Sequence, residues 1–513
     1  MRTKSNELFL LIKSMTKSEK GHFKQHSKFN TKTEDSKYIK LFNIIDRQNE
    51  YNENEIRIAY KGDRTLNQLH VSKNYLYKSI LKSLIQFHSR KINAIQISEL
   101  YNSSLILYQK GLFSEGIKLI HKCKQLAHKY GKYERIFEIH KLEHSLAISL
   151  NRDLPDKYVE NYVIESNDVL EKLYSVKEYR EIYLRLLIEF RKKRFARKPE
   201  DRVLYKEILD HPLLENENKA LSFESKILYN QIYANYFMAI EDDLMFHQHI
   251  KNVVGLFESN EAHAQEFTLE YVSALNSYLS SLLFLKIFRE ADVVINKLKK
   301  IEENTTPYIK NIIFINSYNF LLVKYILTGE FEKGAVLVPE IELRIKRLTG
   351  KKKINVEEKF DYTISYIFFG MGDYENSLKW LNKILSKNQN EVRPDLLSFA
   401  HILNLIIHFE LDNIVLLEYT VKNSYRFLYK RKKLYKVENA VLGFIRRAYG
   451  IDSKEQLTEL FTEQYLKINE ITKDPYEKIA LEYFDLLSWL ESKIENKKFA
   501  DVVRSKAATA KVI

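Results

Sequence analysis

Two histidines and a glutamate lie within five residues of one another and match a known zinc-binding pattern. His140, Glu143 and His144 have the spacing H-x-x-E-H, in which two histidines one helical turn apart share a metal and the glutamate acts as a base. His121 and His128 precede them, but no residue is marked as a third ligand. Since the chain has 14 histidines, such spacings also arise by chance on an ordinary helix face. The sequence therefore predicts no metal site.

A second segment, residues 68–80, is similar to the turn and recognition helix of a helix-turn-helix. Lys73, Asn74, Tyr77 and Lys78 have side chains suited to phosphates or base edges. The turn position often held by glycine is His70, and the preceding helix would be short. The alternative interpretation is a helix that packs its apolar residues inward and leaves its lysines in water. These apolar residues are Leu76, Ile80, Leu81 and Leu84.

Motifs for nucleotide binding and for covalent catalysis are absent. Gly370 and Gly372 lack the third glycine of a dinucleotide-binding loop, and Gly350 lacks the flanking residues of a P-loop. There is no Gly-x-Ser-x-Gly sequence, and the single cysteine, Cys123, has no histidine partner that the sequence identifies. We therefore expect no catalytic residues, no cofactor and no enzymatic activity.

Positive charge is concentrated at the two ends of the chain. Residues 1–92 contain 19 Lys and Arg against 9 Asp and Glu, and residues 497–513 contain 5 against 1. Residues 93–496 contain 58 basic and 58 acidic residues, so this part has no net charge. The formal net charge of +14 for the whole chain therefore comes from its two ends. An uneven charge of this kind favours an anionic partner for the basic part. Nucleic acid is thus a candidate partner of residues 1–92.

Two basic runs lie outside these ends, at residues 191–198 and 430–433. Both fall near predicted helix C-termini, where the helix dipole favours cations. An anion-binding role for them remains an alternative.

Four short segments share a pattern that is typical of a tight turn between two helices. The first residue is a glycine in three copies, an aromatic residue follows two positions later, and a small residue stands three positions beyond the aromatic. The segments are residues 111–116, 286–291, 329–334 and 372–377. Weaker turn signals near residues 155, 199, 242, 412 and 451 extend the series to a repeat of about 42 residues.

Composition and this repeat together predict the fold. Only 13 Gly and 7 Pro occur in 513 residues, so the sequence has few of the turn-forming residues that β-sheets and β-hairpins need. We expect an all-α protein, built as a right-handed α-solenoid of about nine long helical hairpins over residues 93–496. Residues 1–92 form a separate basic helical module, and residues 497–513 a basic C-terminal tail. Pro307, Pro394 and Pro475 are predicted to open helices.

The turn pattern resembles that of tetratricopeptide repeats. Its best copy is residues 372–378, and the resemblance covers about four repeats, although tetratricopeptide units usually have 34 residues. Residues 12–20 and 71–78 also look like the opening of a family of bacterial helical-repeat proteins that brings no established activity with it. Within the first of these segments, Thr16 and Glu19 predict a helix start that divides the opening into two helices.

The resemblance and the repeat lead to two functional expectations. The first is a non-enzymatic scaffold that binds a peptide or protein partner on a concave face lined by the first helix of each hairpin. The second is a DNA-binding regulator that contacts DNA through residues 1–92. The longest apolar stretches are too short or too polar for a membrane span, so we expect a cytoplasmic protein without membrane contact.

Overall fold

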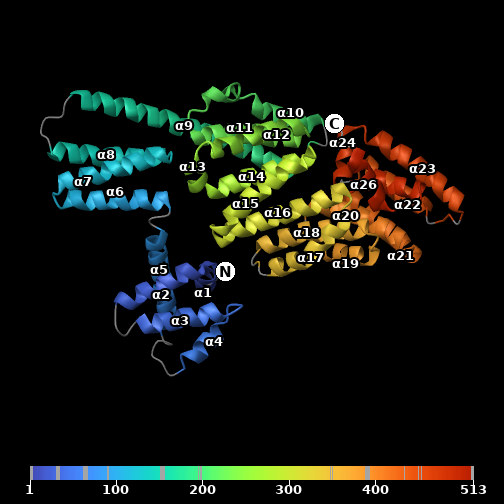
Figure 1. Cartoon of the computed structure of the whole chain (residues 1–513), viewed down its shortest axis with the longest axis horizontal. Helices are drawn as coiled ribbons and strands as arrows, with labels where there is room; N and C mark the ends of the chain where they lie inside the picture. The colour runs from blue at the N-terminus through green and yellow to red at the C-terminus, as the bar shows by residue number, and fades with distance from the viewer. Residues whose placement is uncertain are drawn as a thin grey trace.

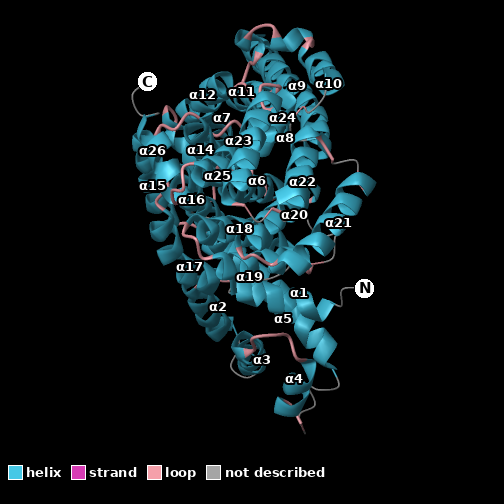
Figure 2. Ribbon diagram, turned by 90° about the vertical axis from the view of Figure 1, so that its right-hand side faces the viewer, coloured by secondary structure: helices cyan, strands magenta, loops and turns pink. Residues whose placement is uncertain are grey.

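A computed structural model shows a chain built from α-helices (Figures 1 and 2). It describes residues 4–30, 35–61, 68–88, 92–150, 156–193, 196, 199–346, 348, 351–387, 393–431, 434–448, 450–451 and 453–509. Helix makes up 86% of the structure, and no strand occurs in these residues. The predicted all-α class is confirmed. None of the described helices is both long and apolar enough to span a bilayer.

Five helices at the N-terminus enclose a core of their own. They are α1 (Lys4–Ser14), α2 (Lys17–Asn30), α3 (Asp35–Arg47), α4 (Glu53–Ala59) and α5 (Leu69–His88). The predicted start of α2 is confirmed: the Thr16 amide donates to Glu19, and the Glu19 amide donates to the Thr16 hydroxyl. Leu8, Phe42 and Ile80 lie in a core cluster drawn from residues 8–84. Figure 1 shows these helices grouped below the rest of the chain, with α5 leading toward α6.

The middle of the chain is a succession of antiparallel helices. Its first helices are α6 (Asn93–Gln109), α7 (Phe113–Lys129), α8 (Tyr133–Leu150), α9 (Asp156–Lys193), α10 (Pro199–Leu209), α11 (Phe223–Ala239), α12 (Asp243–Glu258), α13 (Glu261–Glu266), α14 (Thr268–Phe284) and α15 (Phe288–Glu303). Two short 3₁₀ helices, Pro212–Leu214 and Glu217–Lys219, lie between α10 and α11.

The succession continues with α16 (Pro307–Thr328), α17 (Phe331–Lys346), α18 (Lys351–Gly370), α19 (Tyr374–Leu385), α20 (Pro394–Glu410), α21 (Ile414–Lys430), α22 (Lys436–Ala448) and α23 (Lys454–Ile471). The chain ends with α24 (Pro475–Lys478), a 3₁₀ helix (Ile479–Glu482), α25 (Leu486–Ile494) and α26 (Phe499–Thr509). The three prolines predicted to open helices are the first residues of α16, α20 and α24.

Six of the nine predicted turns share one backbone conformation, and two other described turns adopt it as well. One residue adopts a positive φ, and the amide that follows donates to the carbonyl five residues earlier, which satisfies a helix-end carbonyl. The positive-φ residues at these turns are Gly111, Gly131, Glu241, Lys286, Gly329, Gly372, Asp412 and Asn496. From residue 241 to residue 412 they are spaced by 40 to 45 residues. The turns at Gly131, between α7 and α8, and at Asn496, between α25 and α26, fall outside the predicted series.

The small residue of the turn pattern also has a visible role. A Cβ at Gly116 would lie 2.8 Å from a Leu146 methyl, and one at Gly334 would lie 2.5 Å from Ile367. The hydroxyl of Ser377 donates to the Ser365 carbonyl at 2.8 Å. Small side chains therefore let the second helix of a hairpin approach its neighbours closely.

The predicted period does not hold between residues 155 and 199. A single 38-residue helix, α9, occupies the interval in which the period predicts two helices. Its sequence contains neither glycine nor proline, so no residue in it ends the helix. The predicted turn near 155 falls on residues outside the described ranges, and the turn near 451 is described only at residues 450 and 451.

The C-terminal segment, residues 475–509, folds back on the first helices of the last hairpins. Tyr483 donates to Asp395 of α20, Trp489 donates to Glu410 of the same helix, and the Asp485 amide donates to Tyr366 of α18. Phe499 packs with Phe331, Tyr366, Phe369 and Phe484. This segment is thus part of the largest core of the molecule. The face that α16, α18 and α20 turn toward it is already covered.

Candidate functional site

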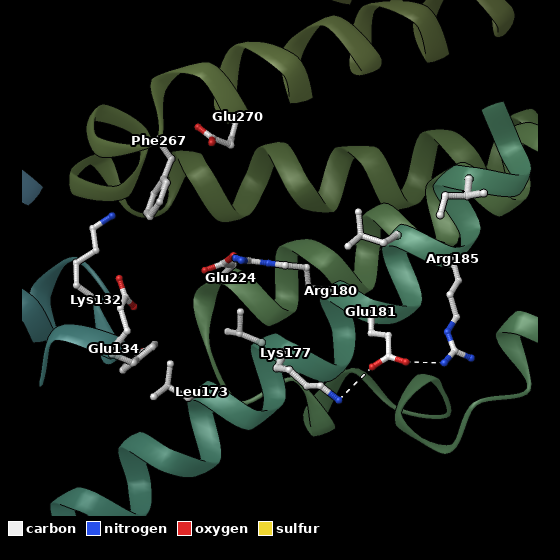
Figure 3. Close-up of a pocket in the computed structure, with 15 residues that line it drawn as sticks. Lys132, Glu134, Leu173, Lys177, Arg180, Glu181, Arg185, Glu224, Phe267 and Glu270 are labelled. Carbon is white, nitrogen blue, oxygen red and sulfur yellow. Dashed lines mark hydrogen bonds and ion pairs between the residues drawn. The ribbon is translucent and has the colours of Figure 1, made fainter. Parts of the chain in front are cut away.

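An open groove of about 750 Å³ lies where α9 passes from α8 to α11 (Figure 3). Four elements form it: the turn before α8, the middle of α9, the start of α11 and the start of α14. Its lining residues are Gly131, Lys132, Tyr133, Glu134, Leu173, Val176, Lys177, Arg180, Glu181, Leu184, Arg185, Ile188, Glu224, Phe267 and Glu270. The groove therefore combines an apolar wall with charged side chains.

The local sequence explains why these elements meet. Gly131 has φ +62° and reverses the chain, so that α8 begins two residues later and Glu134 lies in its first turn. Helix α9 is uninterrupted, so one rigid element packs on α8 with its first half and on α11 with its second half. Ser222 and Ser225 form a capping box that sets the start of α11 beside α9.

The apolar wall comes from one side of α9. Leu173, Val176, Leu184 and Ile188 line the groove, and their exposure increases along the helix. Leu173 packs against a core cluster, whereas Leu184 is 49% exposed and Ile188 is 53% exposed. Aliphatic side chains gathered along one groove and rimmed by charged residues are a usual feature of a surface that binds a partner.

Each of the four lining cations lies beside a carboxylate. Lys132 lies 3.1 Å from Glu266 and 4.4 Å from the centre of the Phe267 ring. The other three pairs are Arg180 with Glu224, Lys177 with Glu181, and Arg185 with Glu181. Hydrogen bonds from Lys177 and Arg185 hold the pKa of Glu181 below its ordinary value. The positive charge of the lining is thus balanced internally.

Two lining carboxylates, Glu134 and Glu270, have no ion-pair partner among the described residues. Glu134 lies in the first turn of α8, and Glu270 lies in the first turn of α14. In Figure 3 both lie at the end of the groove that also holds Lys132 and Phe267, whereas Arg185 lies at the opposite end. The groove therefore has an acidic end.

The four residues proposed for nucleic-acid contact all lie on α5 but differ in their exposure to solvent. Lys73 is only 7% exposed, and its ammonium donates to the Tyr51 hydroxyl at 2.7 Å and to Glu53 at 2.9 Å. Tyr77 is half-buried against the core of the N-terminal helices, while Asn74 and Lys78 are exposed. His70, the expected turn residue, lies inside α5. The ammonium of Lys73 is therefore already engaged within the N-terminal helices.

The two histidines of the H-x-x-E-H pattern differ in burial and in their polar contacts, although both rings lie against Tyr162. His140 is buried, and its Nε2 lies 3.1 Å from Glu165, whereas His144 is exposed and stacks on Tyr158. Glu143 accepts a hydrogen bond from Lys124 at 2.8 Å. Within the part of the chain that is described, no group of three or more His, Cys, Asp and Glu residues is arranged to hold a metal.

The two basic runs lie at helix ends, as expected. Arg191 is exposed in the last turn of α9, and Lys430 is the last residue of α21. Arg431 follows, with its guanidinium 4.9 Å from the centre of the Phe427 ring. The side chains of residues 192–195 and 432–433 lie outside the described set.

Comparison of the chain with family models and with curated proteins finds no match. The groove and the packing of the rest of the molecule are therefore the features that bear on function.

The groove residues were not recognised in the sequence. Leu173, Val176, Leu184 and Ile188 have the helical spacing of an ordinary core stripe, and their neighbours are charged as on any solvated helix. A usable signal is the absence of glycine and proline throughout α9, which indicates a helix longer than the repeat. The positions of Glu224, Phe267 and Glu270 depend on how distant helices pack, which spacing alone does not determine.

Proposed function

We propose that this chain is a non-enzymatic scaffold, an α-solenoid of tetratricopeptide-like hairpins, that binds an apolar segment of a protein partner in the groove along α9. A cytoplasmic location is part of the proposal. The single observation that carries it is the groove itself, which is open, aliphatic on one wall and rimmed by charge. Such a surface matches the helix-in-groove mode of peptide recognition, in which an apolar face provides affinity and rim charges provide orientation.

The packing of the C-terminal segment supports this choice of site. In repeat scaffolds the first helices commonly form the concave binding surface, but here residues 475–509 cover the first helices of the last hairpins. Trp489 and Phe484 are 1% and 2% exposed in that contact. A partner would have to displace a buried aromatic core to reach these helices, whereas the groove along α9 is free.

The alternative of DNA binding through residues 1–92 stays a prediction. It relies on Asn74 and Lys78, which are exposed on α5, and on the basic charge of this part of the chain.

Ile188→Glu tests the proposed site. A carboxylate on the apolar wall should weaken a partner contact by about 1–3 kcal/mol, or roughly 5- to 150-fold in Kd. Affinity purification from the source cells, with quantitative mass spectrometry, should show proteins that the wild type retains and this variant loses. The retained protein is then purified, and its Kd is measured with each variant.

Ile164→Glu is the matched control, because Ile164 is 69% exposed on the same helix but lies outside the groove. It should retain the same partner as the wild type. Equal recovery and equal Kd values with wild type, Ile164→Glu and Ile188→Glu would contradict the proposed site.

A further inference from the structure

The groove is asymmetric in charge. Its lining contains four cations and four carboxylates, but Lys132 and Lys177 also pair with Glu266 and Glu178, which lie outside the lining. The cations are therefore neutralised, and the carboxylates of Glu134 and Glu270 remain unpaired among the described residues. A ligand in the groove meets net negative charge at one end and balanced charge elsewhere.

These two carboxylates lie at the N-terminal ends of their helices. Each is in the first turn of its helix, where the backbone amides and the helix dipole stabilise a negative charge. Both side chains are exposed, so neither carries the cost of burial. A cation placed at the acidic end can form charge-assisted hydrogen bonds with both carboxylates.

The apolar wall sets the length of segment that fits. From Leu173 to Ile188 the wall spans 15 residues of α9, or about 22 Å at a rise of 1.5 Å per residue. This length corresponds to about four turns of a partner helix or about seven residues of extended chain. Leu173 lies toward the acidic end in Figure 3.

We propose that the groove takes an apolar peptide segment that carries lysine or arginine at one end, with the basic end against Glu134 and Glu270. This inference rests on the proposed function, since it names the chemistry of the partner at that site. The aliphatic residues of the segment lie against Leu184 and Ile188. A peptide with an acidic residue at this position is disfavoured, because Glu134 and Glu270 would repel it and no unpaired lining cation would compensate.

A phage-displayed library of random 12-residue peptides, selected on the full-length protein, tests this chemistry. The expected result is enrichment of peptides with aliphatic residues followed or preceded by lysine or arginine. A selected peptide should bind the free protein in fluorescence anisotropy. Its Kd should rise about tenfold in Glu134→Gln/Glu270→Gln, since two charged contacts of roughly 0.7 kcal/mol each are lost.

Charge exchange provides the sharper measurement. In Glu134→Lys/Glu270→Lys, the same peptide with its basic residues changed to glutamate should bind more tightly than the original peptide. Glu171→Lys is the matched control, because Glu171 is exposed on α9 outside the lining, and it should leave the preference unchanged. Circular dichroism verifies that each variant is folded. If Glu134→Lys/Glu270→Lys does not fold, the binding measurement with Glu134→Gln/Glu270→Gln still tests the inference.

The outcomes separate the two proposals. Peptides that bind in an Ile188-dependent way, without basic enrichment and without response to the glutamine pair, overturn this inference and leave the groove as a binding site. If no selected peptide depends on Ile188, both the inference and the proposed site are overturned.

Discussion

Lys73 shows how a residue suited to nucleic-acid contact can serve the fold. Its ammonium lies between Tyr51 and Glu53, and its stem is buried among the N-terminal helices. Hydrogen bonds from Lys73 and then from Arg57 lower the pKa of Glu53 from 4.5 to about 2. The pair thus joins α5 to the segment that begins α4.

Replacing Lys73 should therefore destabilise the N-terminal helices. We expect Lys73→Gln to lower the free energy of unfolding by about 1–2 kcal/mol, because the half-buried Glu53 carboxylate loses one of its two cationic partners and keeps only Arg57. Lys78→Gln, one helical turn further along α5 and exposed, is the control and should change stability by less than about 0.5 kcal/mol.

The pH dependence provides a second measurement on the same variants. A carboxyl whose pKa is lowered by folding stabilises the protein above its unfolded value, and this stabilisation is lost as the pH falls from about 4.5 toward 2. In urea unfolding, the difference between wild type and Lys73→Gln should narrow over this range. If Lys73→Gln and Lys78→Gln change the free energy of unfolding equally at pH 7, the Lys73–Glu53 pair does not contribute to stability.

At the scale of elements, the turns between helices differ in what surrounds them. Gly111 and Gly329 have φ values of +75° and +67°, so both occupy the left-handed region. A Cβ at Gly111 would meet nothing within 4 Å, whereas one at Gly329 would lie 2.9 Å from the Ala500 carbonyl oxygen and 2.9 Å from the Arg504 nitrogen. Gly329 thus serves both its own turn and the docking of α26.

Alanine substitutions should separate these two roles. Gly111→Ala should cost about 1 kcal/mol, the usual penalty of a left-handed alanine. Gly329→Ala should cost about 3 kcal/mol or more, because the backbone of α26 must also move. Thermal unfolding of the two variants, followed by circular dichroism, compares these costs directly. Equal shifts in Tm would mean that α26 does not pack tightly on this turn.

At the scale of the whole molecule, the C-terminal segment connects parts of the chain that are far apart in sequence. Glu482 lies near Glu241 and Asp243 of the α11–α12 turn, and Tyr476 lies under the guanidinium of Arg202 at 5.5 Å. Burial, and next the charge of Glu482, raise the pKa of Glu241 to about 7. Carboxyls therefore face one another where the end of the chain meets its middle.

This contact should make stability depend on pH near neutrality. A carboxyl with a raised folded pKa contributes stability that is present below its unfolded value of 4.5 and lost as the pH rises through 7. Glu241→Gln, which resembles the protonated form, should match wild type in Tm near pH 5. Near pH 9 it should be more stable by about 1–3 kcal/mol, after allowance for the partial exposure of the site.

Glu171→Gln, at an exposed position in α9, should show no such pH-dependent difference. If Glu241→Gln and wild type have the same Tm from pH 5 to pH 9, ionisation of Glu241 does not affect the contact between the C-terminal segment and the α11–α12 turn.

By itself, the sequence determined the helical class, several helix starts and six of the turns between helices. These features are local: a glycine at a left-handed position, a proline in the first turn and the Thr16–Glu19 pair act over a few residues. The length of α9 was also encoded locally, because its sequence contains no glycine or proline. The period of about 42 residues nevertheless predicted two helices in this interval.

The tertiary structure alone decided the groove, the partner of Lys73 and the covered face of the last hairpins. Each depends on residues brought together across long stretches of chain, such as Glu134 with Glu270 and Glu410 with Trp489. Helical spacing states which residues share a face, but not which face another helix will cover. That choice depends on the packing of whole elements, in which burial of large apolar surfaces outweighs any single residue's preference.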